Sequence, residues 1–332
     1  MRRTSRPSTP EKSSRVPSKR PREPRPSARL SRAGGLHHLF RTRNAAMRNV
    51  LETVGKVLDH DVSILILGES GVGKDFLAQS IHACSARRAE PFVHIECASI
   101  PAELFETELF GHERGTFTDA QTRKVGKLEA AGRGTVYLDE VAALTPQLQA
   151  KLLRVMQERR FSRLGGAATL PFEARVITSS NSNPAETLRP DFYYRINVVT
   201  LTLPPLRERT EDIALLARQF VRRTKFRRFD AEAERLMRDY GWPGNIRELR
   251  NAIERAGVVE ESDRITAASL PIREASDIVT TAARGQWTLE ELESHYIREV
   301  LRMTRANYSR AAQILGINRK TLLEKRKKYG IE

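Results

Sequence analysis

The chain has 332 residues, of which 39% are hydrophobic and 30% charged, a balance typical of a soluble globular protein. It contains no run of about 18 apolar residues, which excludes a membrane-spanning helix. Its two cysteines, Cys84 and Cys97, match no metal-binding spacing. We therefore expect buried, reduced thiols in a cytoplasmic protein.

The net charge of +16 is concentrated at the two ends of the chain. Residues 1–35 carry eleven Arg or Lys and two Glu, and residues 305–332 carry eight Arg or Lys and two Glu. The sequence between them is nearly neutral. This distribution predicts that the ends, rather than the body, contact polyanions.

The first segment, residues 1–35, contains six prolines, many Ser and Arg, and almost no large apolar side chain. Such a composition cannot bury enough surface to offset the entropy of the chain, so we expect a disordered basic tail. Nonspecific binding to nucleic acid is one role for it. A solvated tail, or a start codon assigned too far upstream, is the simpler explanation.

From residue 36 onward, short apolar runs alternate with segments of helix length. The five runs expected to be strands are Ser63–Leu67, Phe92–Ile95, Thr135–Leu138, Ala174–Thr178 and Val198–Leu203. Alternation of this kind predicts a parallel sheet flanked by helices. We therefore assign an α/β subdomain to residues 36–205.

The remainder of the chain is expected to be helical. Residues 206–272 are predicted to form helices only, including Asp212–Thr224 and Ala231–Tyr240, and make up a helical subdomain. Residues 273–287 have a mixed polar composition, which indicates a linker. Residues 288–332 are predicted to form a second, all-α domain.

A glycine-rich loop lies between the first expected strand and a helix. Its residues are Gly68, Glu69, Ser70, Gly71, Val72, Gly73, Lys74 and Asp75. The glycines let backbone amides turn toward a phosphate, and the start of the helix adds positive potential. Lys74 would reach the β- and γ-phosphates, although Asp75 stands where a hydroxyl usually follows the lysine. An ordinary glycine-rich turn is the alternative, but the strand before it and the helix after it favour nucleotide binding.

An acidic pair supports this interpretation. The strand expected at residues 135–138 ends in Asp139 and Glu140, 65 residues after Lys74. An aspartate at the end of a buried strand beside a phosphate loop can hold Mg²⁺, and the next glutamate can polarise a water for attack on the γ-phosphate. Such a pair alone would indicate only a solvated strand end. Together with the loop it predicts an ATP-hydrolysing enzyme that uses ATP and Mg²⁺.

Several blocks of sequence occur in a fixed order from Leu36 to Ile331. They are Gly68–Asp75, Glu108–Glu113, Gly134–Glu140, Leu148–Arg154, Tyr193–Arg195, Leu203–Arg209 and Trp242–Arg250. In order and spacing they resemble the AAA+ bacterial enhancer-binding proteins that activate sigma-54 RNA polymerase. The resemblance implies a P-loop parallel sheet with a helical lid at residues 206–272. It also implies a ring hexamer, assembled from dimers, with ATP between subunits.

The resemblance also implies roles for individual residues. Residues 188–195 match the segment whose arginines reach the neighbouring γ-phosphate, which makes Arg189 and Arg195 the candidates; a surface ion pair is the alternative for each. Asn181 matches the polar sensor of the γ-phosphate, and Arg247 matches the sensor arginine of the lid. The stretch from Asn181 to Arg189 is shorter than in the family by roughly five residues, which predicts a shortened helix near the ring pore.

The loop that contacts sigma-54 in this family reads Gly-Ala-Phe-Thr-Gly-Ala. In this chain it is formed by Gly115, Thr116, Phe117, Thr118, Asp119 and Ala120. The central Phe117 and Thr118 are present. Thr116 adds bulk, and Asp119 adds charge and removes the freedom of a glycine, although Asp tolerates a positive φ better than most residues.

A second departure from the family pattern is Glu96, which stands where the family usually places asparagine. That amide restrains the catalytic glutamate until a partner engages. Two carboxylates in this place would repel each other or share a proton. We therefore expect altered switching and slower hydrolysis.

The last domain begins with an amphipathic segment. Its apolar face consists of Leu289, Leu292, Tyr296, Ile297, Val300 and Leu301, which predicts a helix that packs in a core or also forms a dimer contact. In the following stretch, Ala312 allows close helix approach and Gly316 suits a tight turn, which together predict a helix-turn-helix. It resembles the Fis-type domain that ends this activator family.

The second helix of this motif, at about residues 318–328, would enter the major groove of DNA. The residues at its start, where base edges are reached, are Asn318, Arg319, Lys320 and Thr321. The basic residues further along, expected to contact phosphates, are Lys325, Arg326, Lys327 and Lys328. A solvated, charged helix is the alternative interpretation.

These features predict a sigma-54-dependent transcriptional activator that binds upstream DNA and uses ATP hydrolysis to remodel the closed RNA polymerase complex. Thr116, Asp119 and Glu96 motivate an alternative: a DNA-binding repressor or non-sigma-54 regulator with a vestigial or regulatory ATPase. A stand-alone remodelling enzyme for proteins is a third possibility. Because the tail is too short to form a receiver or ligand-sensing domain, we expect control by a partner protein or by expression level.

Overall fold

The structure is a computed structural model. It describes residues 35–36, 39–116, 122–221, 228–260, 264–272, 287–304 and 307–331. The predicted basic tail up to residue 34, nearly all of the predicted linker, and Phe117–Ala120 of the predicted sigma-54 loop lie outside these residues. No helix in the described part is long and apolar enough to cross a membrane.

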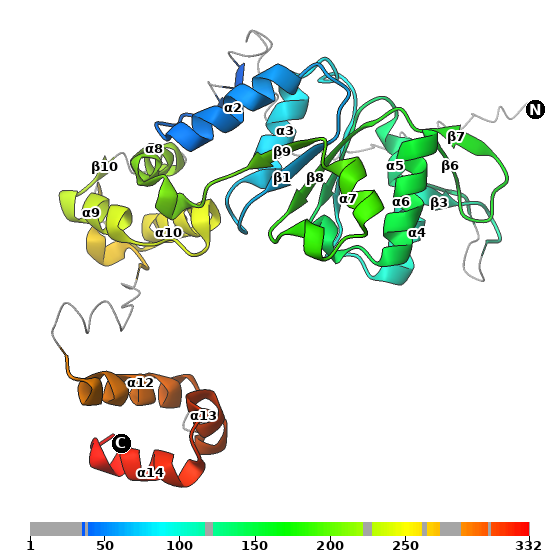
Figure 1. The fold of residues 1–332 in the computed structure, drawn as a ribbon. Helices are drawn as coiled ribbons and strands as arrows, with labels where there is room; N and C mark the ends of the chain where they lie inside the picture. The colour runs from blue at the N-terminus through cyan, green and yellow to red at the C-terminus, as the bar shows by residue number, and fades with distance from the viewer. Residues whose placement is uncertain are drawn as a thin grey trace, which may run out of the picture. The chain divides into compact units, whose positions relative to one another are not determined.

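The centre of the predicted α/β subdomain is a five-stranded parallel sheet in the order β2-β5-β8-β1-β9 (Figure 1). Its strands are β1 (Ile64–Leu67), β2 (Phe92–Glu96), β5 (Thr135–Asp139), β8 (Arg175–Ser180) and β9 (Val199–Thr202). Each lies within two residues of the predicted run. The predicted α/β fold with a parallel sheet is therefore confirmed.

Two layers of helices cover the sheet, and the strands divide their side chains between them. Ile64 and Ile66 pack with α2 (Ala45–Val57) and α3 (Lys74–Cys84), whereas Leu65 packs on the opposite face. The helices of that opposite face are α4 (Ala102–Phe110), α5 (Lys127–Ala131), α6 (Pro146–Glu158) and α7 (Pro190–Ile196). Successive side chains of a strand point to opposite faces, so a strand covered on both sides is apolar throughout.

The parallel register brings the carboxyl ends of the strands to one edge of the sheet. Glu96 at the end of β2 lies opposite Asp139 at the end of β5, and Leu67 of β1 lies opposite Ser180 of β8. The loop after β1 and the short 3₁₀ turns η1 (Val141–Ala143) and η2 (Pro184–Glu186) follow these strands. Ligands of open α/β sheets bind at this edge.

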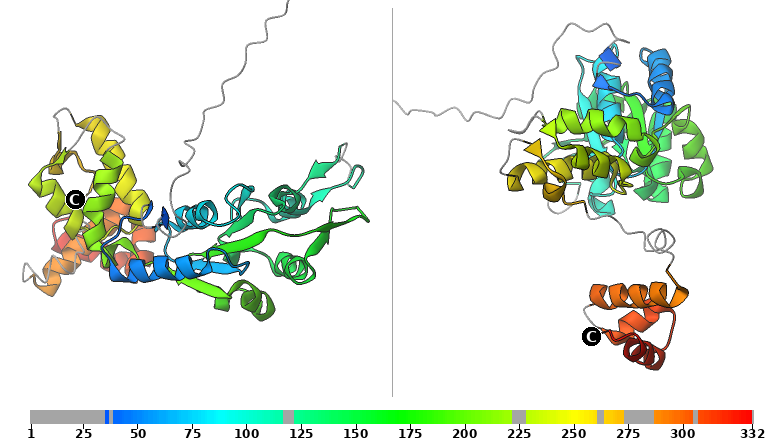
Figure 2. Two further views of the ribbon diagram at one scale, coloured as in Figure 1. Left: turned by 90° about the horizontal axis from the view of Figure 1, so that it is seen from above. Right: turned by 90° about the vertical axis from the view of Figure 1, so that its left-hand side faces the viewer.

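Two small antiparallel hairpins extend from the α/β subdomain (Figure 2). One pairs β3 (Gly111–His112) with β4 (Lys124–Val125), and the other pairs β6 (Arg160–Ser162) with β7 (Thr169–Pro171). An isolated bridge between His112 and Leu164 joins them. The predicted sigma-54 loop therefore starts from the first hairpin, beside the second.

The lid corrects one prediction, because residues 206–272 are not helical throughout. The helical elements are η3 (Leu206–Glu208), α8 (Thr210–Val221), α9 (Ala231–Asp239), α10 (Asn245–Val259) and η4 (Ala267–Ser269). Between them, β10 (Arg228–Phe229) pairs with β11 (Arg264–Ile265). Ile265 is fully buried in the core of the lid, and the Asp230 N–H donates to its carbonyl at 3.0 Å. Strands of two residues have no periodicity that a sequence could reveal.

The last domain consists of α12 (Leu289–Met303), α13 (Tyr308–Leu315) and α14 (Arg319–Lys328) around a core of its own. Gly316 ends α13 with a φ of 66°, a left-handed conformation that glycine adopts without strain. The predicted apolar face of α12 is divided. Ile297, Val300 and Leu301 are buried in the core, whereas Leu289 and Tyr296 are 83% and 47% exposed.

Candidate functional site

The glycine-rich loop joins β1 to the start of α3 and depends on two glycines. Gly71 has a φ of 76°, and a Cβ added there would lie 2.4 Å from the carbonyl oxygen of Gly244 in the lid. Gly73 precedes the helix with a φ of 104°. Larger residues are strained in such conformations. The loop therefore passes close to the lid at Gly71, just before α3 begins.

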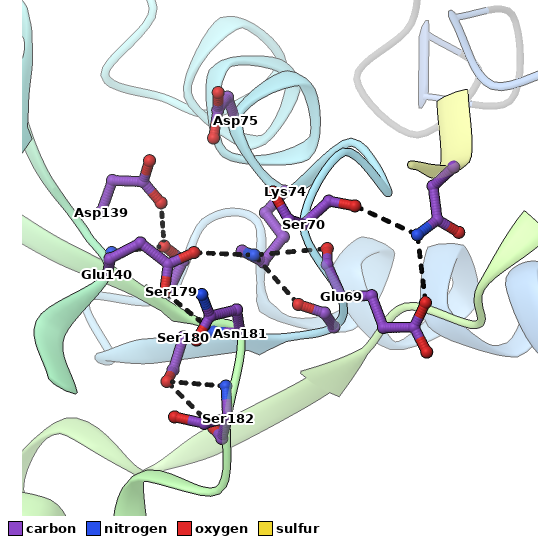
Figure 3. A network of polar contacts seen from close by, with 12 residues as sticks. Glu69, Ser70, Lys74, Asp75, Asp139, Glu140, Ser179, Ser180, Asn181 and Ser182 are labelled. Atoms are coloured by element: carbon purple, nitrogen blue, oxygen red, sulfur yellow. Dashed lines mark hydrogen bonds and ion pairs between the residues drawn. The ribbon is translucent and has the colours of Figure 1, made fainter. Parts of the chain in front are cut away.

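Lys74 connects the loop to the acidic strand end (Figure 3). Its side chain is only 5% exposed, and its ammonium lies 2.9 Å from the Gly68 carbonyl oxygen and 3.0 Å from Oε1 of Glu140. The other Glu140 oxygen accepts the backbone N–H of Asn181 at 2.9 Å. A buried ammonium needs such partners. The structure thus brings together Lys74 at the start of α3, Glu140 after β5 and Asn181 after β8.

Ser179 holds the two acidic residues in relation to each other. Its hydroxyl accepts the Glu140 backbone N–H at 3.1 Å and donates to the Asp139 carboxylate. Glu140 adopts a left-handed conformation, with φ and ψ both 56°, which is unfavourable for a residue with a side chain. The chain therefore turns sharply after Asp139, and the turn sends the Glu140 carboxylate toward Lys74.

Asp139 is ionised in this environment. Burial favours its neutral form, but the nearby His94 ring, hydrogen bonds from Ser179 and Tyr137, and the charge of Lys74 hold its pKa at about 2. The same contact raises the pKa of His94, whose Nε2 lies 3.9 Å from Asp139. A stable anion at this strand end is what a divalent cation requires.

Asp75 and Asp139 share one hydroxyl. Oη of Tyr137 lies 3.0 Å from Oδ1 of Asp75 and 2.9 Å from Oδ1 of Asp139. No group of three or more His, Cys, Asp or Glu in the described part of the chain could hold a metal ion. Mg²⁺ at phosphate-transfer sites needs only one or two carboxylates beside phosphate and water, so Asp139 with Asp75 nearby fits that ion.

Three residues of the lid form hydrogen bonds with the phosphate loop. The Arg207 guanidinium forms a fork with the Glu69 carboxylate at 2.6 and 2.9 Å, and this hydrogen bonding lowers the pKa of Glu69. Asn245 donates to Glu69 at 3.1 Å and to the Ser70 carbonyl at 3.0 Å. Arg247, the expected lid sensor, donates to the Ser70 hydroxyl at 3.1 Å. Loop and lid are therefore mechanically connected.

A cavity of about 470 Å³ opens between the phosphate loop, the lid and residues 39–42. Its charged lining includes Lys74, Asp139, Glu140 and Arg247. Its apolar lining includes Leu39, Phe40, Phe76, Leu216 and Phe220. A lining that offers both charged and apolar groups suits a ligand that combines phosphates with a flat base.

Neither predicted finger arginine is among the residues that line this cavity. The Arg189 guanidinium forms an exposed fork with Asp191 at 2.7 and 3.1 Å. Arg195 donates to the Met156 carbonyl oxygen at 2.6 Å. Within one chain, both arginines therefore have local partners away from the phosphate loop.

Glu96, the second departure from the family pattern, is exposed at the end of β2, and its carbonyl oxygen accepts the Ser99 hydroxyl at 3.1 Å. The carboxylate of Glu140 contacts Lys74 and Asn181. The expected repulsion between Glu96 and Glu140 thus stays a prediction.

The start of the predicted sigma-54 loop is held by the second hairpin. The Thr116 hydroxyl lies 3.0 Å from the Leu164 carbonyl oxygen. Arg163, whose side chain is 7% exposed, pairs with Glu113 at 2.7 Å and with both carboxylate oxygens of Glu129. These hydrogen bonds raise the pKa of Arg163. The two hairpins are therefore fastened together just before Phe117.

In the helix-turn-helix, Asn318 is the N-cap residue of the second helix, α14. Its Oδ1 accepts the Thr321 N–H at 2.8 Å and the Thr321 hydroxyl at 3.0 Å. An N-cap of this kind satisfies an otherwise unpaired helix donor. Arg319 and Lys320 are exposed at the start of the helix, where the predicted base contacts lie.

Three of the four basic residues further along this helix have partners inside the domain. Lys325 pairs with Glu293 of α12 at 2.6 Å, and Lys328 pairs with Glu290 at 2.6 Å. Arg326 donates to the Ile331 carbonyl oxygen at 2.9 Å. Their expected role in phosphate contact stays a prediction, and these partners would compete with it.

The parallel sheet, the phosphate loop with its acidic strand end, and the lid that contacts this loop define a P-loop ATPase of the AAA+ class. The chain matches three family models: the sigma-54 interaction domain at residues 40–202, the AAA+ ATPase lid domain at residues 207–284, and the Fis family of bacterial regulatory proteins at residues 288–329. The chain belongs to the sigma-54-dependent transcriptional activators.

Curated relatives extend over most of the chain. It is 41% identical to the regulatory protein AtoC of Escherichia coli over 311 residues, which cover 88% of this chain and 68% of AtoC. It is 36% identical to the DNA-binding transcriptional regulator NtrC of Rhizobium meliloti over 334 residues, which cover 87% of this chain and 69% of NtrC. The chain thus spans about two thirds of these relatives.

Solved structures agree with this assignment. The crystal structure of NtrX from Brucella abortus in complex with ATP has a TM-score of 0.64 and 33% identity, and the match covers 87% of this chain and 69% of that one. The NtrX complex with ADP has a TM-score of 0.62 at the same identity. The predictions of an AAA+ ATPase, a nucleotide ligand, and sigma-54 and DNA as partners are confirmed.

Proposed function

We propose that the chain hydrolyses ATP where Lys74, Asp139, Glu140 and Asn181 meet, and that hydrolysis acts on the polymerase through the loop that begins at Gly115. The position of Glu140 carries this proposal. Its carboxylate joins the ammonium of Lys74 at 3.0 Å to the backbone N–H of Asn181 at 2.9 Å. The groups expected to hold the γ-phosphate, activate the attacking water and sense the γ-phosphate are therefore connected by two contacts.

Binding of a triphosphate would change these contacts. Phosphate oxygens compete with Glu140 for the Lys74 ammonium, because a charge-assisted hydrogen bond to phosphate is at least as strong as one to a carboxylate. Glu140, once displaced, would be available to polarise a water. Since Asn181 donates to the same carboxylate, its segment would respond to the displacement.

Asp139 would hold Mg²⁺ together with phosphate oxygens, and this ion would neutralise charge that develops during phosphoryl transfer. The low pKa of Asp139, about 2, keeps the carboxylate ionised for this purpose. Tyr137 and Ser179 orient it through their hydroxyls. These two residues act by positioning the carboxylate.

We further propose that the chain works as a ring, expected to be a hexamer assembled from dimers. Arg189 and Arg195 do not line the cavity of their own chain, so a role at the γ-phosphate requires a neighbouring subunit. There the guanidinium would stabilise charge on the transferred phosphoryl group. For this, Arg189 would leave Asp191, and Arg195 would leave the Met156 carbonyl oxygen.

The helix-turn-helix would hold the ring at upstream DNA. The exposed Arg319 and Lys320 are the proposed base readers, with Asn318 and Thr321 beside them. Leu289, Tyr296 and Met303 recur every seven residues on α12 and are 83%, 47% and 70% exposed. Apolar residues at this interval form one helix face, and we propose that this face pairs two copies of the domain.

A subunit-mixing experiment tests the proposed role of the arginines in a neighbouring subunit. Arg195→Ala removes the arginine and keeps Glu140, whereas Glu140→Gln does the reverse. Each variant alone is expected to be nearly inactive. In a one-to-one mixture, about a quarter of the interfaces of a ring combine an intact Glu140 with an intact Arg195, so ATPase activity should recover to about that fraction of wild type.

The control for mixing is a pair of variants that share a defect: Lys74→Ala with Glu140→Gln. Lys74 and Glu140 act from the same subunit at each site. No subunit in this mixture has both residues intact, so the mixture should stay inactive. Mixtures of Arg195→Ala and Glu140→Gln that form rings without recovery of activity would contradict the proposal.

A further inference from the structure

Thr116 stands immediately before Phe117, and its side chain reaches a hairpin 48 positions further along the chain. Its Oγ1 lies 2.6 Å from the Glu113 carbonyl oxygen and 3.0 Å from the Leu164 carbonyl oxygen. A hydroxyl has a single hydrogen, so it donates to one of the two carbonyls at a time. The alanine usual at this place in the family has no such donor.

The hairpin is shaped to receive this side chain. Gly165 follows Leu164 with a φ of 70°, and a Cβ added there would lie 2.4 Å from Oγ1 and 2.9 Å from Cγ2 of Thr116. Only a residue without a side chain permits this approach. The threonine and the glycine therefore fit each other across the two hairpins.

The other links between the hairpins are the ion pair of Arg163 with Glu113 at 2.7 Å and hydrogen bonds of the backbone. The Leu164 N–H donates to the Gly111 carbonyl oxygen at 3.0 Å, and the Glu113 N–H donates to the Leu164 carbonyl oxygen at 3.0 Å. Of these links, the Thr116 hydroxyl is the nearest to Phe117 along the chain. A Cβ added at Gly115, between Glu113 and Thr116, would meet nothing within 4 Å. Packing around Gly115 therefore does not hold this segment in place.

We propose that Thr116 is a positioning residue that fastens the start of the sigma-54 loop to the hairpin of β6 and β7. The proposal rests on the proposed role of this loop toward the polymerase. Its consequence is that Thr116→Ala, which restores the usual family residue, weakens the engagement of sigma-54 by this chain. Loss of one hydrogen bond of ordinary net strength predicts binding that is about fivefold weaker.

Substitutions at Thr116 separate the hydroxyl from the shape of the side chain. Thr116→Val keeps the branched shape and removes the donor, whereas Thr116→Ser keeps the donor and removes a methyl. Thr169→Val is the matched control, because Thr169 is an exposed threonine of β7, in the hairpin that Thr116 contacts, and it pairs through its backbone. Each full-length protein is titrated with sigma-54 in the presence of ADP and aluminium fluoride.

The proposal predicts binding about fivefold weaker for Thr116→Val, and affinities close to that of wild type for Thr116→Ser and Thr169→Val. Wild-type affinity in Thr116→Val would overturn it. Equal losses in Thr116→Ser and Thr116→Val would overturn it too, because the hydroxyl would then be irrelevant. Equal losses in Thr116→Val and Thr169→Val would also overturn it, because the effect would then not be specific to Thr116.

Amide hydrogen exchange without sigma-54 distinguishes failure of this inference from failure of the proposed function. Exchange across residues 163–166 should be faster in Thr116→Val than in wild type and unchanged in Thr116→Ser. Unchanged exchange in both variants would show that Thr116 does not fasten the hairpin. If wild type binds no sigma-54, the proposed role of the loop fails, and the exchange rates still decide whether this contact exists in solution.

Discussion

The ammonium of Lys74 and the carboxylate of Glu140 form an ion pair at 3.0 Å. The residue expected to hold the γ-phosphate is thus paired with the residue expected to activate water. Because Lys74 is only 5% exposed, this pairing is stronger than one at the surface. ATP must compete with Glu140 for Lys74 before hydrolysis can begin.

Glu140→Gln should therefore bind ATP at least as tightly as wild type, since a neutral amide competes less for Lys74. Turnover should fall by about 100-fold or more, because removal of a general base costs this much. Titration calorimetry and a steady-state ATPase assay measure the two effects. Equal hydrolysis by wild type and Glu140→Gln would show that another group activates the water.

Gly71→Ala should weaken ATP binding by about tenfold or more, because strain at a positive φ and a close contact are combined at this position. The added Cβ would lie 2.4 Å from the Gly244 carbonyl oxygen and push the lid from the phosphate loop. Gly55→Ala is the control, since its Cβ meets nothing within 4 Å. Unchanged ATP affinity in Gly71→Ala would mean that the contact between loop and lid is dispensable.

The Asp139 site predicts a stability difference that depends on pH. Asp139 has a folded-state pKa of about 2, below its ordinary value of 3.8, so its ionised form stabilises the folded state at higher pH. This contribution is complete above about pH 4 and is lost as the pH falls toward 2. Denaturant unfolding should therefore show that the difference in the free energy of unfolding between wild type and Asp139→Asn becomes smaller as the pH falls from about 4 to about 2.

His94 determines how the stability difference between wild type and Asp139→Asn changes at higher pH. Its pKa is raised by Asp139, so its charged form stabilises the folded state at low pH, and this contribution is lost as the pH rises through the folded-state pKa. The difference between wild type and Asp139→Asn should thus be largest at mildly acidic pH. A difference independent of pH would contradict the assigned contacts.

Glu293→Gln should strengthen DNA binding by the last domain. Lys325 pairs with Glu293 at 2.6 Å, and its release would add a cation to the helix that is proposed to meet DNA. Each added phosphate contact steepens the dependence of log K on log salt by about one unit. Glu299→Gln is the control, because it removes the same charge from α12 and releases Arg302 of that helix instead. Equal salt slopes in both variants would show that Lys325 does not reach phosphate.

The parts of the ATP site that could be predicted from the sequence are local in the chain. The phosphate loop and the pair Asp139 and Glu140 each follow a recognisable strand, and a parallel sheet brings strand ends to one edge. Tyr137, His94 and Ser179 could not be identified in this way. They look like ordinary members of strands, and their role depends on contacts with Asp139 that only the fold creates.

Other differences also arise from long-range contacts. The strands β10 and β11 have two residues each and depend on pairing across the lid. The sequence shows that Lys325 and Arg326 are positively charged. It does not show where their side chains point, which is determined by their contacts with Glu293 and Ile331. From the sequence, Thr116 is only a departure from the alanine usual in the family. The contact of its hydroxyl with the Leu164 carbonyl oxygen becomes visible only in the structure.

Transcription in vitro from a sigma-54 promoter, with purified polymerase and an upstream binding site, tests the central claim most directly. Wild type should produce transcripts only when ATP is present, and Lys74→Ala should produce none, because it loses the cation that holds the phosphates. No transcript from a wild-type protein that forms rings and hydrolyses ATP would contradict the claim. Equal transcription with Lys74→Ala would contradict it as well.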